Sequence, residues 1–179
     1  MKEITWYGRG GQGAFTASRI LGAAAMTGGF KSLAFPSFGP ERRGAPIRAF
    51  TRISRDRIVD RSIVRNNDYI IVLDDTLYDS ALLKSLKENG RLLINTNRDR
   101  NYFDDERVLP GDISSYAEQI LKRPIVNIGI LGMLAAVDPD IGSEEIYKAV
   151  TEYMSGKVAA KNIKLFDMIY NIYGGRGND

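Results

Sequence analysis

Two segments near the start of the chain are rich in the glycine and arginine residues that proteins use to hold anions. The glycine loop (residues 8–13) reads Gly8-Arg9-Gly10-Gly11-Gln12-Gly13, and the arginine loop (residues 35–46) reads FPSFGPERRGAP. Each follows a segment typical of a β-strand, and loops at the carboxyl ends of strands meet at the ligand-binding edge of an α/β sheet. We expect the two loops to lie together and to hold an anionic group or a partner that carries one.

The spacing of Gly8, Gly10 and Gly13 matches G-x-G-x-x-G between a predicted strand and a predicted helix. Backbone N–H groups and the helix N-terminus can bind a phosphate there, so the whole glycine loop is a candidate cofactor-binding site. A dinucleotide site also needs an acidic residue about 20 positions further on. The second predicted strand ends instead in Ala34-Phe35-Pro36, which disfavours free nicotinamide or flavin dinucleotides. A tight turn that lets the helix pack closely on the sheet is the alternative interpretation.

In the arginine loop, two of the three prolines flank the adjacent arginines. Pro40 and Pro46 restrict the backbone at both ends, and arginine is suited to bidentate recognition of carboxylate or phosphate. Arg48 and Arg52, on one face of the next predicted strand, are expected to extend this basic patch. A solvated loop with internal ion pairs is the alternative to a contact surface. We interpret the loop as a contact surface whose central residues are Phe38, Glu41, Arg42, Arg43 and Gly44.

Asp74 and Asp75 follow the most apolar predicted strand, a position where two acids can bind a metal or act as acid and base. The favoured interpretation is that one caps the following helix and the other is solvated. The chain has neither histidine nor cysteine, which excludes a histidine base, a disulfide and a cysteine-ligated iron–sulfur cluster. We therefore assign no catalytic residue and no metal site.

The pattern of apolar residues predicts alternating strands and helices. Residues 69–95 carry the clearest strand–helix–strand succession, which is typical of a parallel sheet. Helix 125–137 is expected to pack closely through Gly129 and Gly132, and Val108 to open a short extended segment. The predicted strands are residues 4–7, 30–35, 47–53, 57–59, 69–73 and 91–95, and the predicted helices are residues 14–26, 76–88, 113–121, 125–137, 143–154 and 158–173.

The composition indicates one soluble domain spanning residues 1–179. The net charge is +3, with 44% hydrophobic and 26% charged residues, which is too mildly basic to imply nucleic-acid binding. No segment approaches the ~20 apolar residues of a membrane span, and the amino terminus lacks the organisation of a signal peptide. We expect a cytoplasmic protein with a frayed C-terminal tail.

The glycine and arginine loops together resemble the gamma subunit of 2-oxoacid:ferredoxin oxidoreductases, in particular of the pyruvate synthase type. The resemblance continues through Arg61-Ser62, residues 124–127 and residues 157–162, and so covers nearly the whole chain. The arginine loop is much the more specific of the two motifs. The resemblance implies an α/β fold: a three-layer α/β/α, Rossmann-like domain with a mixed, mostly parallel sheet.

The resemblance also implies a reaction. The family converts a 2-oxoacid and coenzyme A to an acyl-CoA and CO2, and reduces ferredoxin. Thiamine diphosphate with Mg2+ is expected on the alpha and beta subunits, and 4Fe-4S clusters on beta and delta. This chain alone would bind no cofactor and would be inactive. The implied partners are the alpha, beta and delta subunits and, through the complex, ferredoxin, with no nucleic acid and no membrane.

Within that family, we expect Arg9, Arg42 and Arg43 to help form the path of the coenzyme A phosphates or the interface beside it. One alternative is a stand-alone module that binds a nucleotide or coenzyme A through the glycine loop. Another is a structural subunit whose loops contact only protein. The favoured 2-oxoacid is pyruvate, with 2-oxoisovalerate and 2-oxoglutarate close behind.

Overall fold

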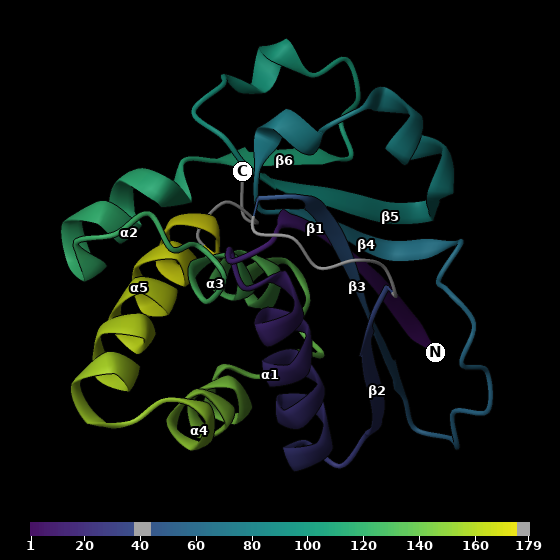
Figure 1. Cartoon of the computed structure of the whole chain (residues 1–179). Coiled ribbons are helices and arrows are strands. Elements are labelled where there is room, and N and C mark those ends of the chain that lie inside the picture. The colour runs from purple at the N-terminus through teal and green to yellow at the C-terminus, as the bar shows by residue number, and fades with distance from the viewer. Residues whose placement is uncertain (38–43, 175–179) are drawn as a thin grey trace.

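A six-stranded mixed sheet forms the centre of the molecule (Figure 1). The computed structural model describes residues 1–37 and 44–174. The strands lie in the order β2-β3-β1-β4-β5-β6, with β1, β4, β5 and β6 parallel to one another and β3 antiparallel to both β1 and β2. Their bounds are β1 Lys2–Arg9, β2 Lys31–Pro36, β3 Pro46–Ser54, β4 Asn67–Val72, β5 Leu86–Asn95 and β6 Val108–Gly111.

Both faces of the central strands are buried, as expected for parallel strands rich in β-branched residues. On β4, Ile71 contributes to the core beneath one face, while Ile70 and Val72 belong to the core on the other. All three side chains are fully buried. This burial explains why the apolar run at residues 69–73 is the clearest strand signal in the sequence.

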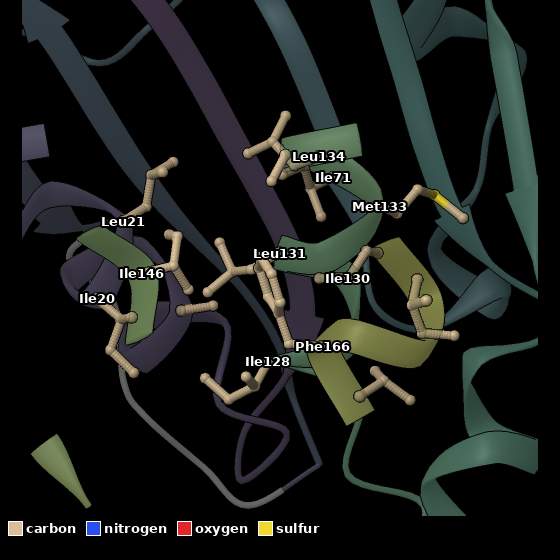
Figure 2. Close-up of a cluster of buried hydrophobic side chains, with 14 of the residues drawn as sticks. Ile20, Leu21, Ile71, Ile128, Ile130, Leu131, Met133, Leu134, Ile146 and Phe166 are labelled. Carbon is tan, nitrogen blue, oxygen red and sulfur yellow. The ribbon is translucent and has the colours of Figure 1, made fainter. Parts of the chain in front are cut away.

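Five α-helices cover one face of the sheet (Figure 1). Their side chains interlock with the sheet in the larger core, where Ile20 and Leu21 of α1, Leu131 and Leu134 of α3, and Phe166 of α5 gather (Figure 2). The bounds are α1 Ala14–Thr27, α2 Ile113–Leu121, α3 Gly129–Val137, α4 Ser143–Tyr153 and α5 Gly156–Gly174.

The opposite face is covered by short 3-10 helices, which corrects the predicted α-helix at residues 76–88. These helices are η1 (Asp75–Leu77), η2 (Ser80–Ser85) and η3 (Arg100–Tyr102). Asp74 and Asp79 each accept a hydrogen bond from a backbone N–H two residues on, so the chain is capped twice and interrupted between the caps. Because β5 begins at Leu86, the Asn89-Gly90 pair expected to end that helix lies within a strand.

The α/β class and the mixed, mostly parallel sheet are confirmed, as are helices at residues 14–26, 113–121 and 143–154 to within one residue. The helix expected from residue 125 begins at Gly129, and the last helix begins at Gly156 rather than residue 158. The strand predicted at residues 57–59 was wrong, because that segment is irregular. No helix in the described part of the chain is long and apolar enough to cross a membrane. The assignment of residues 1–179 to one domain stays a prediction, and the expected frayed tail lies outside the described residues.

The contact between α3 and α5 depends on glycines, as the sequence predicted. A Cβ atom at Gly132 would lie 2.4 Å from the carbonyl oxygen of Phe166, and one at Gly129 would lie 3.1 Å from Cγ of Leu165, both in α5. The backbone of α5 therefore approaches α3 more closely than any side chain at residue 132 would allow.

We expect Gly132→Ala to lower the free energy of unfolding. Overpacking a core costs about 1–3 kcal/mol, more than the gain of up to about 1 kcal/mol from replacing a helical glycine. Gly174→Ala is the matched control, because a Cβ there meets nothing closer than 3.9 Å. Denaturant unfolding of both variants measures the difference, and equal stabilities would contradict the close packing of α3 and α5.

Candidate functional site

The glycine loop forms a tight turn at the carboxyl end of β1, between the strand and α1. Gly11 and Gly13 have φ of +96° and +82°, a region that favours glycine. The backbone N–H of Gln12 donates to the carbonyl of Arg9 at 3.0 Å, and the N–H of Arg9 donates to Oε1 of Gln12 at 2.7 Å. The turn is therefore closed by its own backbone and by the Gln12 side chain.

The two loops lie together, as the sequence predicted. The N–H of Gly10 donates to the carbonyl of Ala45 at 2.9 Å, and the N–H of Gly44 donates to the carbonyl of Gly10 at 3.1 Å. Nη1 of Arg9 adds a 3.2 Å hydrogen bond to the carbonyl of Gly44. Of the residues assigned to the contact surface, Gly44 is described, while Phe38, Glu41, Arg42 and Arg43 lie outside the described residues.

Asp74 connects the glycine loop to the end of β4. Its Oδ2 accepts a hydrogen bond from Nε2 of Gln12 at 2.8 Å and lies 3.3 Å from Nε of Arg9. Its Oδ1 accepts from the N–H of Thr76, which confirms the predicted capping role. Partial burial alone would raise the pKa of Asp74, but hydrogen bonds from Thr76 and Gln12 and the charge of Arg9 outweigh it, so the pKa is lowered. The carboxylate is thus held ionised beside the glycine loop.

Asp75 does not share that role. Its Oδ2 accepts a hydrogen bond from Oγ1 of Thr96 at 2.7 Å and lies 3.6 Å from Nε of Arg98. The carboxylate is therefore bound to the end of β5 rather than simply solvated. Across residues 1–37 and 44–174, no group of three or more acidic residues is placed to hold a metal ion.

A polar cavity of about 460 Å3 opens beside Gln12, across the carboxyl ends of β4 and β5. Asn95 organises it: its Nδ2 donates to the carbonyl of Leu73, and its Oδ1 accepts from the N–H of Ser114, both at 3.0 Å. The sequence interpretation missed this cavity, although the polar residues 95–97 at the end of a predicted strand were the available signal. The acidic side chains that line it are Asp74, Asp75 and Asp112.

The hydrogen bonds and charges around the glycine loop do not favour the binding of an anion there. The N–H groups of Arg9, Gly10 and Gln12 all donate within the protein, and the adjoining cavity is lined by carboxylates, which repel phosphate. The observed conformation therefore resembles the tight-turn alternative. The assignment of the loop as cofactor-binding stays a prediction.

Gly13 marks the closest approach of the loop to its surroundings. A Cβ there would lie 2.6 Å from Nδ2 of Asn127, a buried residue that precedes α3. At Gly8, a Cβ would lie 3.1 Å from Cβ of Ala14 in α1. In the described part of the chain, Oδ1 of Asn127 has no hydrogen-bond partner. Glycine thus allows α1 and Asn127 to pack directly against the turn.

Arg52 does not extend a basic patch, which corrects the prediction for that residue. Its side chain is buried, with Nε 3.0 Å from Oε1 of Glu3 and Nη2 3.2 Å from Oδ2 of Asp60. Arg48, four residues earlier on the same strand, is exposed as expected. Arg52 is buried and Arg48 is not because Glu3 on β1 and the segment around Asp60 supply partners for the Arg52 guanidinium.

Comparisons with known proteins match nearly the whole chain. The family model described as pyruvate ferredoxin/flavodoxin oxidoreductase matches residues 3–172. The chain is 41% identical to pyruvate synthase subunit PorC of Methanocaldococcus jannaschii, over 96% of each chain. It is 38% identical to the common gamma subunit of the pyruvate/ketoisovalerate oxidoreductases of Thermococcus kodakarensis, again over 96% of each. The crystal structure of pyruvate oxidoreductase subunit PORC of Thermotoga maritima superposes with a TM-score of 0.83 at 35% identity, over 95% of each chain.

We expect Gly13→Ala to destabilise the protein more than Gly11→Ala. Both positions have positive φ, so each alanine costs about 1–2 kcal/mol of backbone strain, but a Cβ at Gly11 meets nothing within 4 Å. The additional loss at Gly13, of about 1 kcal/mol or more, measures the contact with Asn127. Thermal unfolding of the two variants is the measurement. Equal losses of stability would show that the Asn127 side chain moves aside, and that its contact with Gly13 does not constrain the turn.

Proposed function

Because the chain belongs to the pyruvate ferredoxin/flavodoxin oxidoreductase family and is the gamma subunit of a 2-oxoacid:ferredoxin oxidoreductase, we propose that its 2-oxoacid is pyruvate. The observation that carries this proposal is the 41% identity to a pyruvate synthase subunit over 96% of both chains. The relative shared by pyruvate and ketoisovalerate oxidoreductases makes 2-oxoisovalerate the second candidate.

In the proposed reaction, pyruvate and coenzyme A give acetyl-CoA and CO2, and the two electrons released reduce ferredoxin. A 4Fe-4S cluster requires cysteine thiolates, and this chain has no cysteine, so its residues do not fit a cluster. We assign the clusters, and thiamine diphosphate with Mg2+, to the alpha, beta and delta subunits. We take the gamma chain as one domain of residues 1–179 in a cytoplasmic complex. Its proposed role is to contact the catalytic subunits rather than to bind their cofactors.

The two loops at the carboxyl end of β1 are the proposed contact region of the subunit. Arg9 is fixed there by Asp74, by the carbonyl of Gly44 and by a 2.7 Å hydrogen bond from its Nη2 to Oγ1 of Thr76, yet 34% of its side chain stays exposed. A guanidinium held in one position can meet a phosphate or carboxylate without further ordering. We assign the glycine loop, with Phe38, Glu41, Arg42, Arg43 and Gly44, to the interface with the catalytic subunits or to the coenzyme A path beside it.

A stand-alone nucleotide-binding module is the weaker proposal. The relatives are named as subunits of larger enzymes, and three backbone donors of the glycine loop are engaged within the protein. Free N–H groups would be needed for phosphate binding by the isolated chain.

Affinity purification of the tagged chain from its native cell extract tests the function. We expect the eluate to contain thiamine- and cluster-binding subunits and to reduce a redox dye when pyruvate and coenzyme A are both supplied. The preferred substrate follows from rates with pyruvate, 2-oxoisovalerate and 2-oxoglutarate. Recovery of the chain alone, without such partners, would overturn the subunit assignment.

In the assembled complex, we expect Arg42→Ala/Arg43→Ala to raise the KM for coenzyme A about tenfold, because two charge-assisted contacts to phosphate would be lost. The KM for pyruvate and the subunit composition should stay unchanged. Arg123→Ala is the control, since Arg123 is exposed after α2. An intact complex with an unchanged KM for coenzyme A would limit the arginine loop to protein contacts.

A further inference from the structure

The connector between β3 and β4 (residues 55–66) is an irregular segment whose residues are mostly exposed. It contains no helix or strand and is longer than most connections in compact domains. In Figure 1 it lies at the right, beyond the ends of the central strands, near the N-terminus and far from the glycine loop. Long connections of this kind are commonly functional.

Buried Arg52 holds the middle of the connector in place. Only 1% of this residue is exposed. Its Nη1 donates to the carbonyls of Asp60 and Ser62 at 3.0 and 2.7 Å, and its Nη2 pairs with the Asp60 carboxylate. The N–H of Ser62 in turn donates to Oδ1 of Asp60. Burying a guanidinium is costly unless its donors are satisfied, so this clamp fixes the shape of the connector.

Among residues 55–66, all of which the structure describes, only Ile58 and Val64 are not exposed. Asp60 and Ser62 bind Arg52, Val64 is 7% exposed, and Ile58 is half-buried. We name as the connector surface five of its exposed residues, which combine arginine and aliphatic side chains: Arg57, Val59, Arg61, Ile63 and Arg65.

The connector surface combines apolar and cationic groups that are unused by the rest of the described chain. Val59 is 79% and Ile63 is 44% exposed. Within residues 1–37 and 44–174, no carboxylate lies within 4.0 Å of a charged nitrogen of Arg57, Arg61 or Arg65. Three acids near the connector in the fold pair with other side chains: Glu3 and Asp60 pair with Arg52, and Asp68 pairs with Lys87.

The chemistry of this surface restricts what can cover it. Arginine is enriched at protein interfaces, and aliphatic side chains between arginines provide an apolar centre. Arginines desolvated at an interface need anionic partners. The connector has no aromatic residue on which a base could stack, which single-stranded nucleic acids require. A protein surface with carboxylates around an apolar patch satisfies each of these conditions.

We propose that the connector surface docks a carboxylate-bearing face of another subunit of the oxidoreductase complex. This inference rests on the proposed function, since it requires the chain to act inside a complex. The connector joins the end of β3 to the start of β4, whereas the glycine loop follows the end of β1. The subunit would therefore contact its partners at the two opposite ends of the central strands.

The test is the charge reversal Arg57→Glu/Arg61→Glu in the complex, co-expressed with its partner subunits and purified through a tag on one of them. Like charges at the interface should cut recovery of the gamma chain about tenfold, and the loss should shrink as salt screens the repulsion. Lys161→Glu/Lys164→Glu, two exposed residues of α5, makes the same change in net charge elsewhere and should leave recovery within about twofold of the unchanged chain. Thermal unfolding of each gamma variant confirms that it is folded.

Recovery of the connector variant equal to that of the unchanged chain would overturn the proposal, as would an equal loss in both variants. Binding to anionic lipid vesicles that the connector variant loses while assembly persists would assign the surface to a membrane and overturn it as well. Failure of the unchanged chain to join any oxidoreductase subunit would instead refute the proposed function. The two failures are therefore distinguishable in one experiment.

Discussion

The close approach of α1 to the end of the central strand β1 is the constraint on which the loop region depends. Cβ atoms at Gly8 and Gly13 would lie 3.1 Å from Ala14 and 2.6 Å from Asn127, so these two positions have little or no room for a side chain. Because β1 lies between β3 and β4, a turn this tight brings the glycine loop against the arginine loop on one side and against Asp74 on the other. A wider turn would separate all three.

Arginine is used in the same way at both ends of this part of the sheet. Arg9 donates to the carbonyl of Gly44 while its charge is balanced by Asp74. Arg52 donates to two connector carbonyls while Glu3 and Asp60 balance its charge. In each case one planar guanidinium pairs with a carboxylate and also donates hydrogen bonds to carbonyl groups of an irregular segment. The compact ammonium group of lysine does not offer this planar arrangement of donors. Segments without helix or strand thereby acquire a defined shape.

The sequence predicted those features that depend on local pattern. The buried strand at residues 69–73, the glycine-mediated packing of α3 and the meeting of the two loops follow from apolar runs and glycine spacing. The helix expected at residues 76–88 failed because Asp74 and Asp79 cap the chain twice, and the pattern of leucines does not reveal that interruption. The burial of Arg52 was not predictable, because it depends on Glu3, which is 49 residues away in sequence. The polar cavity at Asn95 likewise depends on contacts between separate strands and α2.

A chain without cysteine or histidine has few ways to take part directly in redox or acid–base chemistry. A subunit of this kind acts through the surfaces it presents, and their geometry must survive without a partner if assembly is to be efficient. β1 links the two surfaces considered above, since Glu3 near its start pairs with the Arg52 clamp and Arg9 at its end pairs with Asp74. Five residues of β1 thus separate the two anchors, and displacement of that strand would alter both proposed contact regions together.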